Sequence, residues 1–298
     1  THPLMAARRL LATAAPFRRT SCAPVYSRRL CTPEAASESS MLVVHRQEEH
    51  IASVQLSHKP VNALTHDVCV ALTRAVRELE DDPEVHGMLL GSAVSGIFSA
   101  GLDIRTFHGA SEQTLATYWT AVQEMWLTLY TSRLATVAAI GGHSPAGGCL
   151  LSLSCDERVM VEGKFRIGLN ETQLGIVAPD WFAALLSDAV GVRQAYRMLQ
   201  LGELVSPATA LERGLIDEVV PLHQLHGAAT ARLNAMLRIP HQARVATKQM
   251  LRRPNAEALR SRQSEDLDIF MACLTDPAVQ AIIGTYLQSL KKKPDKGK

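Results

Sequence analysis

Two short segments of the sequence hold residues whose types could move protons. The run from Gly141 to Leu150 reads GGHSPAGGCL, so an apolar side chain stands at Leu150 directly after a turn of small residues. The run from Gly168 to Gly175 carries a single acid, Glu171, among apolar neighbours. A carboxylate in apolar surroundings is expected to be partly buried with a raised pKa, which suits a general base near neutral pH. One acid and one apolar neighbour therefore indicate proton shuttling and not the addition of water.

Length and composition are those of a globular chain. It has 298 residues, of which 47% are hydrophobic, so it can bury a full core as one large domain or two of ordinary size. No stretch of about 18 residues is both uncharged and predominantly apolar, so we expect no integral membrane segment. Without the six arginines of residues 1–33, the formal charge of +2 becomes about −4 for the remainder. Nucleic acid is therefore not an expected partner.

The two ends of the chain differ in composition from the middle. Residues 1–33 contain six arginines, several Ser, Thr and Ala, and no acid before Glu34, which is typical of a mitochondrial transit peptide. We expect residues 1–40 to be a transit peptide with a flexible lead, and the mature protein to lie in the mitochondrial matrix. A basic disordered arm is the alternative. Residues 291–298 contain five lysines and are expected to form a solvated tail.

The cysteines form no recognisable metal or redox motif. Two of them fall in the predicted presequence, and the others show neither a CxxC pair nor the Cys/His spacing of a metal site. The others are Cys69, Cys149, Cys155 and Cys273. We expect reduced, mostly buried thiols, no metal and no redox cofactor.

Apolar periodicity predicts alternating strands and helices in the first two thirds of the chain. The predicted strands are 41–46, 51–56, 86–92, 135–140 and 158–161. The first two are expected to form a hairpin, and the predicted helices are 68–79 and 112–130. This order favours an α/β fold in which strands lead into functional loops. Periodicity alone does not separate a doubly wound sheet from a spiral of ββα units.

Strand signals nearly vanish after Asp188. Helical patterns follow, and they cover 193–201, 207–213, 223–237, 242–251 and 257–275. The sequence therefore predicts a core with the site over residues 41–200 and a mainly helical region over 201–290.

Five separated motifs resemble the crotonase (enoyl-CoA hydratase/isomerase) superfamily, in the order that the superfamily has them. They are Lys59–Leu64 (KPVNAL), Phe98–Ile104 (FSAGLDI), Gly141–Leu150, Cys155–Asp156 and Gly214–Val220 (GLIDEVV). Each is weak alone because small glycine-rich loops are common, but five in order are a specific signal. Within the superfamily, residues 145–149 and 169–176 are most similar to members that isomerise enoyl-CoA.

The resemblance implies a spiral of ββα units with a C-terminal helical trimerisation region, a homotrimer, and an acyl-CoA thioester as substrate. It places the two backbone N–H groups that hold the thioester oxygen at Leu102 and Gly147. Each such preorganised donor is worth about 10²- to 10³-fold in rate. The expected substrate contacts border the CoA part, with Asn170 added as a neighbour of the thioester or base. They are Ala100, Gly101, Leu102, Asp103, Ile104, Gly147 and Asn170.

Leu150 stands where the hydratases of the superfamily carry a second acid, as the resemblance implies. Leucine cannot activate water, so Glu171 remains as the one base. The expected reaction takes a proton from carbon 2 of a 3-enoyl-CoA, cis or trans, and returns it at carbon 4, which gives trans-2-enoyl-CoA in fatty acid β-oxidation. Positioned proton transfer of this kind contributes about 10²- to 10⁴-fold. The acyl pocket is expected to include Trp126, Phe182 and the last helices.

Asp180 leaves two other reactions of the superfamily open. The dienoyl-CoA isomerases and acyl-CoA hydrolases of the superfamily carry an extra acid about eight residues past the position of Glu171. In this chain the residue eight positions past Glu171 is Pro179, and Asp180 is one place beyond. Asp180 is also a normal helix N-cap before Trp181. Ser144 lacks the glycine and the partners of a nucleophile elbow, which argues against a serine hydrolase. A non-catalytic acyl-CoA-binding protein would be expected to lose Glu171.

Overall fold

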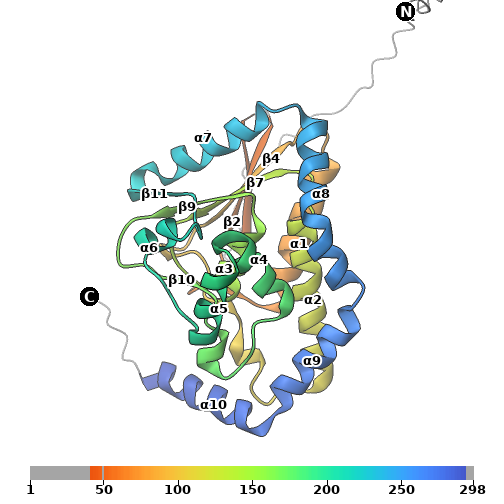
Figure 1. Ribbon diagram of the computed structural model, residues 1–298, viewed down its shortest axis with the longest axis vertical. Helices are drawn as coiled ribbons and strands as arrows, with labels where there is room; N and C mark the ends of the chain where they lie inside the picture. Colours follow the sequence, from red (N-terminus) through yellow and green to blue (C-terminus); the bar gives the residue numbers. More distant parts are fainter. Residues whose placement is uncertain (1–40, 49, 293–298) are drawn as a thin grey trace, which may run out of the picture. The chain divides into compact units, whose positions relative to one another are not determined.

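Strands and helices alternate along most of the chain, and Figure 1 shows their arrangement. The structure is a computed structural model, and it describes residues 41–48 and 50–292. The predicted presequence over residues 1–40 and residues 293–298 of the predicted lysine-rich tail lie outside the described residues. The fold is therefore that of the chain from Met41 onward.

Within the described residues, a six-stranded sheet forms the centre of the fold, in the strand order β1-β2-β4-β7-β9-β11. Its strands are β1 (Leu42–Glu48), β2 (Ile51–Leu56), β4 (Gly87–Ser92), β7 (Ala135–Ile140), β9 (Glu157–Val161) and β11 (Glu218–Val220). β1 and β2 pair antiparallel, which confirms the predicted hairpin, and the other neighbours pair parallel. Parallel neighbours need a crossover connection, which the helices supply.

Shorter strands in the same part of the chain form two small sheets, in the orders β10-β8-β5 and β3-β6. These strands are β3 (Ala63–Leu64), β5 (Gly96–Ile97), β6 (Gly101–Leu102), β8 (Gly142–Pro145) and β10 (Ile167–Gly168). A long strand, a short strand and a helix follow one another repeatedly, as β7, β8 and α3 (Gly147–Ser154) do. The predicted spiral of ββα units is confirmed.

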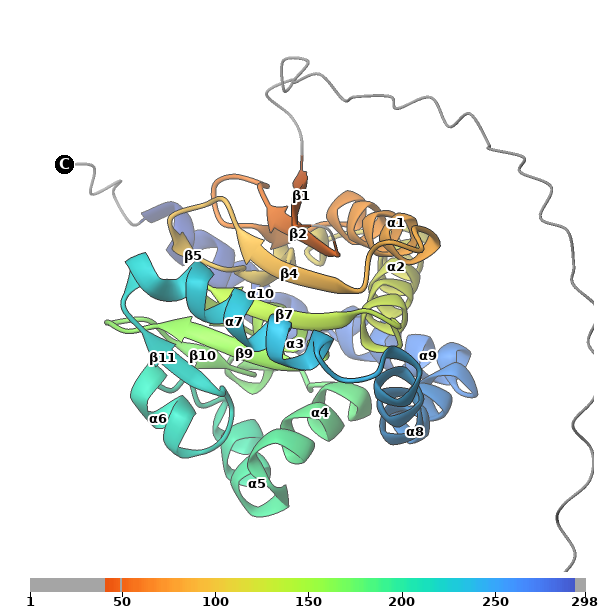
Figure 2. The ribbon, with the colours of Figure 1, turned by 90° about the horizontal axis from the view of Figure 1, so that it is seen from above.

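The helices cover both faces of the main sheet. α7 (Leu225–Leu237) packs across β4, β7 and β9 on one face, as Figure 2 shows. The opposite face carries α3 together with α1 (His66–Asp81) and α2 (Glu112–Tyr130). The remaining helices are α4 (Asp180–Val190), α5 (Val192–Leu201), α6 (Pro207–Glu212), α8 (His241–Arg260), α9 (Gln263–Thr275) and α10 (Pro277–Lys292). The last three follow the side and the bottom of the molecule in Figure 1 as an arc.

Side chains of the main sheet alternate between two cores. Leu89 of β4 and Val137 of β7 pack with the residues of α7. Their neighbours Met88, Leu90 and Ala138 belong to the larger core beneath α1, α2 and α3. Successive residues of a strand point to opposite faces, so a sheet covered on both faces needs continuous apolar runs. This is why the central strands could be predicted from such runs.

The last third of the chain departs from the sequence prediction in its element boundaries. The patterns over 242–251 and 257–275 predict a break near Pro254, but α8 continues through this proline and α9 begins only at Gln263. β11 has three residues, too few for an alternating pattern, and its parallel pairing with β9 defines it. α10 is not predicted by the pattern.

α9 and α10 form a bent pair with a 68° angle between them. Within the described residues, no single helix is long and apolar enough to cross a membrane. The bent pair meets the length and composition criteria only when its two helices are counted together.

A buried ion cluster joins α8 to the main sheet. Asp156, immediately before β9, pairs with the ammonium of Lys248 at 2.9 Å and the guanidinium of Arg252 at 2.8 Å. It also accepts a hydrogen bond from the backbone N–H of Thr136 at 2.8 Å. Burial alone would raise the pKa of Asp156, but the two cations hold this pKa below its ordinary value. The Asp156 carboxylate is therefore a structural link between helix and sheet.

Replacement of Asp156 by Ala is expected to lower the free energy of unfolding by about 3–5 kcal/mol, because it leaves buried cations without a partner. Urea unfolding followed by circular dichroism measures the change. Glu78→Ala is the control, since it breaks only the exposed pair with Arg74 on α1 and should cost less than about 0.5 kcal/mol. A loss in Asp156→Ala as small as that of the control would contradict the structural role.

Candidate active site

The glycine-rich segment makes a strained turn between β8 and α3. Ala146 has φ 49° and ψ −122°, a backbone conformation that residues other than glycine rarely adopt. Its N–H donates to the carbonyl of Gly168 at 2.8 Å, which links the turn to β10. A methyl group on Gly148 would lie 2.5 Å from the carbonyl oxygen of Ser99, so only glycine fits there. The turn makes Gly147 the first residue of α3, where backbone N–H groups have no partner within the helix.

A second backbone segment reaches the same point from β6. Leu102 ends this strand, which pairs with β3. A methyl group on Gly147 would lie 3.1 Å from the Leu102 nitrogen, and one on Gly101 would lie 2.8 Å from the Gly147 nitrogen. The backbones of the two predicted donors are thus brought together from distant parts of the sequence. The N-terminal end of α3 also favours negative charge near Gly147.

Glu171 begins the short 3-10 helix η2 (Glu171–Leu174), which follows β10. The residue is 4% exposed, and neither carboxylate oxygen has a hydrogen-bond partner among the described residues. Burial raises the pKa of Glu171 to about 7. The prediction of a buried acid with a raised pKa is confirmed. A carboxyl group that titrates near neutral pH can both take and return a proton.

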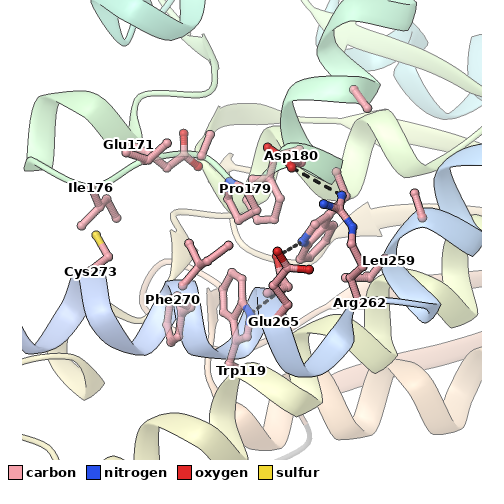
Figure 3. Close-up of a pocket in the computed structure, with 18 of the residues that line it drawn as sticks. Trp119, Glu171, Ile176, Pro179, Asp180, Leu259, Arg262, Glu265, Phe270 and Cys273 are labelled. Carbon is pink, nitrogen blue, oxygen red and sulfur yellow. Dashed lines mark hydrogen bonds and ion pairs between the residues drawn. The ribbon is translucent and has the colours of Figure 1, made fainter.

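A cavity of about 340 Å³ adjoins Glu171, and Leu102 is part of its lining. This volume suits a small organic group. Most of the wall is apolar or aromatic, and its aromatic members are Trp119, Trp181, Phe182 and Phe270. In Figure 3, Glu171 and Ile176 lie across the cavity from α9, whose Phe270 and Cys273 face them.

The predicted CoA contacts lie on the segment around β6. Ala100 and Gly101 lead to Leu102, and Asp103 and Ile104 follow it. Asp103 accepts a hydrogen bond from the side chain of Arg105 at 2.9 Å. Of this segment, Leu102 reaches the cavity lining and the other four residues do not.

Three further residues that the sequence singled out are not part of the cavity lining. They are Gly147, Leu150 and Asn170. Leu150 is fully buried in α3. The side-chain oxygen of Asn170 is buried and has no hydrogen-bond partner among the described residues. Asn170 directly precedes Glu171 in the chain and is the residue before η2.

Asp180 is not the N-cap that the sequence analysis offers as one interpretation. Pro179 occupies the cap position, and Asp180 is the first residue of α4. The Asp180 carboxylate is 88% exposed and lies 3.5 Å from the guanidinium of Arg262. It borders the cavity but is directed toward Arg262 (Figure 3).

The cavity wall was predicted in part, because the last helices supply much of it, as expected. Phe182 lines the cavity as expected, whereas Trp126 lies behind Trp181, with ring centroids 4.8 Å apart. Trp119 was missed, and Phe270 was not singled out although its helix was expected there, because each looks like an ordinary core residue on a helix. Their helical spacing indicates burial, but it does not show that they face a cavity.

The described cysteines are free thiols. Three of them are buried, as predicted, and burial raises the pKa of Cys69 to about 12. Within the described residues, no cluster of three or more His, Cys, Asp or Glu side chains is placed to hold a metal ion.

Two neighbouring backbone amides, a buried carboxylate and an apolar cavity are the parts required by an enzyme that removes a proton beside a carbonyl group. The model of the enoyl-CoA hydratase/isomerase family matches residues 46–294. The chain therefore belongs to the enoyl-CoA hydratase/isomerase family.

Relatives include proteins from mammalian mitochondria. Mitochondrial enoyl-CoA delta isomerase 1 of Mus musculus is 44% identical over 244 residues, which cover 82% of this chain and 84% of that protein. The Homo sapiens protein of the same name is 41% identical over 244 residues, which cover 82% and 81%. The crystal structure of human mitochondrial delta3-delta2-enoyl-CoA isomerase matches with a TM-score of 0.84 and 39% identity, over 87% of this chain and 100% of that one.

Replacement of Glu171 by Gln is expected to stabilise the protein at high pH. An ordinary Glu loses its proton near pH 4.5, whereas folded Glu171 keeps it to about pH 7. Between these values the folded state binds more protons than the unfolded state, so the free energy of unfolding falls as pH rises. The full loss is about 3 kcal/mol and is complete above pH 7.

Urea unfolding of Glu171→Gln should therefore give a free energy of unfolding about 1–3 kcal/mol above wild type at about pH 8, and a difference below about 1 kcal/mol at about pH 5. Glu162→Gln, which changes an exposed acid, is the matched control and should stay within about 0.5 kcal/mol at both pH values. Equal stability of wild type and Glu171→Gln at both pH values would contradict the burial of an ionisable Glu171.

Proposed function

We propose that this protein is an isomerase of fatty acid β-oxidation that converts a 3-enoyl-CoA, cis or trans, into trans-2-enoyl-CoA. The observation that carries the proposal is Glu171, a buried acid with a pKa of about 7 in a cavity whose wall is mostly apolar and includes Leu102. The names of the mouse and human relatives, which are enoyl-CoA delta isomerases, support it.

In the proposed reaction, the thioester oxygen accepts hydrogen bonds from the backbone N–H groups of Leu102 and Gly147. The Glu171 carboxylate takes a proton from carbon 2, and the electron pair of that C–H bond moves into a dienolate whose negative charge lies on the thioester oxygen. Glu171 then returns its proton to carbon 4, and the double bond forms between carbons 2 and 3. One base serves both transfers because the carbons are conjugated and can lie on the same face. The two amides stabilise the intermediate between the transfers.

The proposed reaction requires that water stay away from the dienolate. Leu150 is fully buried and apolar, so it offers no group to activate water. The aromatic wall of the cavity acts in the same direction, because a dry site strengthens the hydrogen bonds to the thioester oxygen. Hydration would require a second acid or base, and in this proposal none is supplied at Leu150.

We further propose where the rest of the substrate binds. The segment Ala100–Ile104 would border the CoA part, and Asn170 would contact the thioester or the base. The acyl chain would enter the cavity beyond Glu171, along the aromatic wall. Proton transfer between carbons needs no redox change, so no metal or cofactor is part of the proposed mechanism, and CoA is part of the substrate.

The composition of the chain and its relatives also bear on where the protein acts. The arginine-rich N-terminal composition and the mitochondrial relatives support a mitochondrial protein, and we propose the matrix, where the presequence would lead. A homotrimer is proposed from the family resemblance alone. The charge of the predicted mature chain, about −4, gives no reason to expect a nucleic-acid partner.

The reactions that would use Asp180 as a second acid have less support. A dienoyl-CoA isomerase or an acyl-CoA hydrolase would need this carboxylate to face the acyl group. Instead it is 88% exposed and pairs with Arg262. A binding protein without activity would not need the raised pKa of Glu171.

Steady-state assays with a 3-enoyl-CoA and a 2-enoyl-CoA, supplied separately, test the proposal. Wild type should isomerise the first and leave the second unhydrated, with activity that falls below about pH 7 because Glu171 must be ionised to act as base. Glu171→Gln should lower kcat by about 10²- to 10⁴-fold, whereas Glu162→Gln should match wild type. Hydration as fast as isomerisation would overturn the proposed reaction, and full activity in Glu171→Gln would overturn the assignment of the base.

A further inference from the structure

One carboxylate, that of Asp266, joins α9 to two other helices. Its Oδ2 accepts hydrogen bonds from the indole N–H of Trp119 and the side-chain amide of Gln123, each at 2.7 Å. Its Oδ1 accepts a hydrogen bond from the indole N–H of Trp181 at 3.1 Å. The Gln123 amide also donates to the backbone carbonyl of Gln263, the first residue of α9, at 3.1 Å. Because these donors belong to α2 and α4, α9 is held to both.

The three donors of this cluster are buried and uncharged. Trp119, Gln123 and Trp181 are 1%, 2% and 4% exposed. Hydrogen bonds that involve an ionised group are about twice as strong as neutral ones. Removal of the acceptor would leave buried N–H groups without a partner, which is costly. The Asp266 cluster therefore holds α9 more firmly than apolar packing alone would.

The same side chains fix the aromatic wall opposite Glu171. Trp119 stacks on Phe270, one helical turn after Asp266, with ring centroids 3.8 Å apart and planes at 9°. Trp181 packs against Trp119 at 5.9 Å. All of these residues line the cavity that Glu171 lines, and Figure 3 shows Trp119 and Phe270 across the cavity from Glu171. The burial of Glu171 therefore depends on where α9 lies.

We propose that Asp266 is a positioning residue for the isomerisation, which locks α9 over the cavity and so keeps water from Glu171. The inference rests on the proposed function, because only there does Glu171 act as base. Asp266 does not touch the reacting atoms in this proposal. When the hydrogen bonds of the Asp266 cluster are lost, water reaches the Glu171 carboxylate, stabilises its charged form and makes it a weaker base. The water also weakens the hydrogen bonds to the thioester oxygen.

Other ionisable groups around Glu171 must be separated from this effect. Cys149 of α3 is close enough to interact electrostatically with Glu171. Besides Glu171 and Asp266, the ionisable side chains that line the cavity are Asp180, Arg262, Glu265 and Cys273. Asp266→Asn removes a negative charge as well as part of the lock, so the control must remove a charge from the same helix. Asp268, exposed on α9 and outside the cavity lining, supplies it.

The test compares Asp266→Asn, Asp266→Ala and Trp119→Phe with Asp268→Asn. For each variant, kcat and KM for a 3-enoyl-CoA are measured from about pH 5 to about pH 9, together with tryptophan fluorescence. The chain has three tryptophans, and Trp119, Trp126 and Trp181 are all buried, so a red shift of their emission reports opening. Asp266→Ala should lower kcat by about 10- to 100-fold. The acid limb of its pH profile, near pH 7 in wild type, should move about one unit lower.

Trp119→Phe keeps a ring and removes one donor, so it should shift the acid limb in the same direction by a smaller amount; because this substitution also removes one of the three emitters, its pH profile is the readout. Asp268→Asn should match wild type. The proposal is overturned if the Asp266 and Trp119 variants keep the wild-type pH profile of kcat, or if they lose activity while the acid limb of that profile stays near pH 7. If Asp266→Ala does not fold, the pH profiles of Asp266→Asn and Trp119→Phe test the proposal in its place. If the wild-type protein has no isomerase activity, the proposed function is wrong. The tryptophan emission of the Asp266 variants would still show whether Asp266 holds α9.

Discussion

The Glu171 carboxylate is buried, and neither of its oxygens has a hydrogen-bond partner among the described residues. A group in this state opposes folding whenever it is ionised, so the surrounding structure must hold it in position. β10 and η2 place the residue, and the helices of the last third cover it. The raised pKa follows from this enclosure, since burial is its main cause. The burial of Glu171 therefore has two effects: it gives the carboxyl group the pKa of a useful general base, and it lowers the stability of the folded protein when that group is ionised.

The spiral explains how distant segments meet around this acid. β5, β8 and β10 are neighbours in one small sheet, although each follows a different long strand of the main sheet. Their order places the segments before Leu102, Gly147 and Glu171 beside one another. The close approach of these backbone segments requires glycine at position 148, because a side chain on Gly148 would collide with the carbonyl of Ser99. The N–H of strained Ala146 donates to the carbonyl of Gly168, so the turn and the strand before the acid are fixed together.

Local patterns predicted the elements that are long and strongly periodic. α2 and β7 have the predicted bounds, 112–130 and 135–140, because a buried helix face and a strand buried on both sides leave clear apolar signals. β11 and the continuation of α8 through Pro254 depend on packing between distant residues, which a local window does not contain. The buried state of Glu171 was predicted from its apolar neighbours. Phe182 and the last helices were expected in the cavity wall and line it, but Trp119 and Phe270 were not singled out, because they differ from core residues only by the gap they face.

Two side chains bear on which reaction this scaffold supports. Leu150 is buried in α3, so a hydrophobic contact occupies the position that the resemblance assigns to a second acid. Asp180 carries a charge near the cavity, but its exposed carboxylate pairs with Arg262 at the corner between α8 and α9. If proton transfer at Glu171 is the chemistry, its outcome depends on how well water is excluded during the lifetime of the dienolate. The helices that cover the cavity then help to select the product, and the hydrogen bonds that hold α9 belong to catalysis as much as to stability.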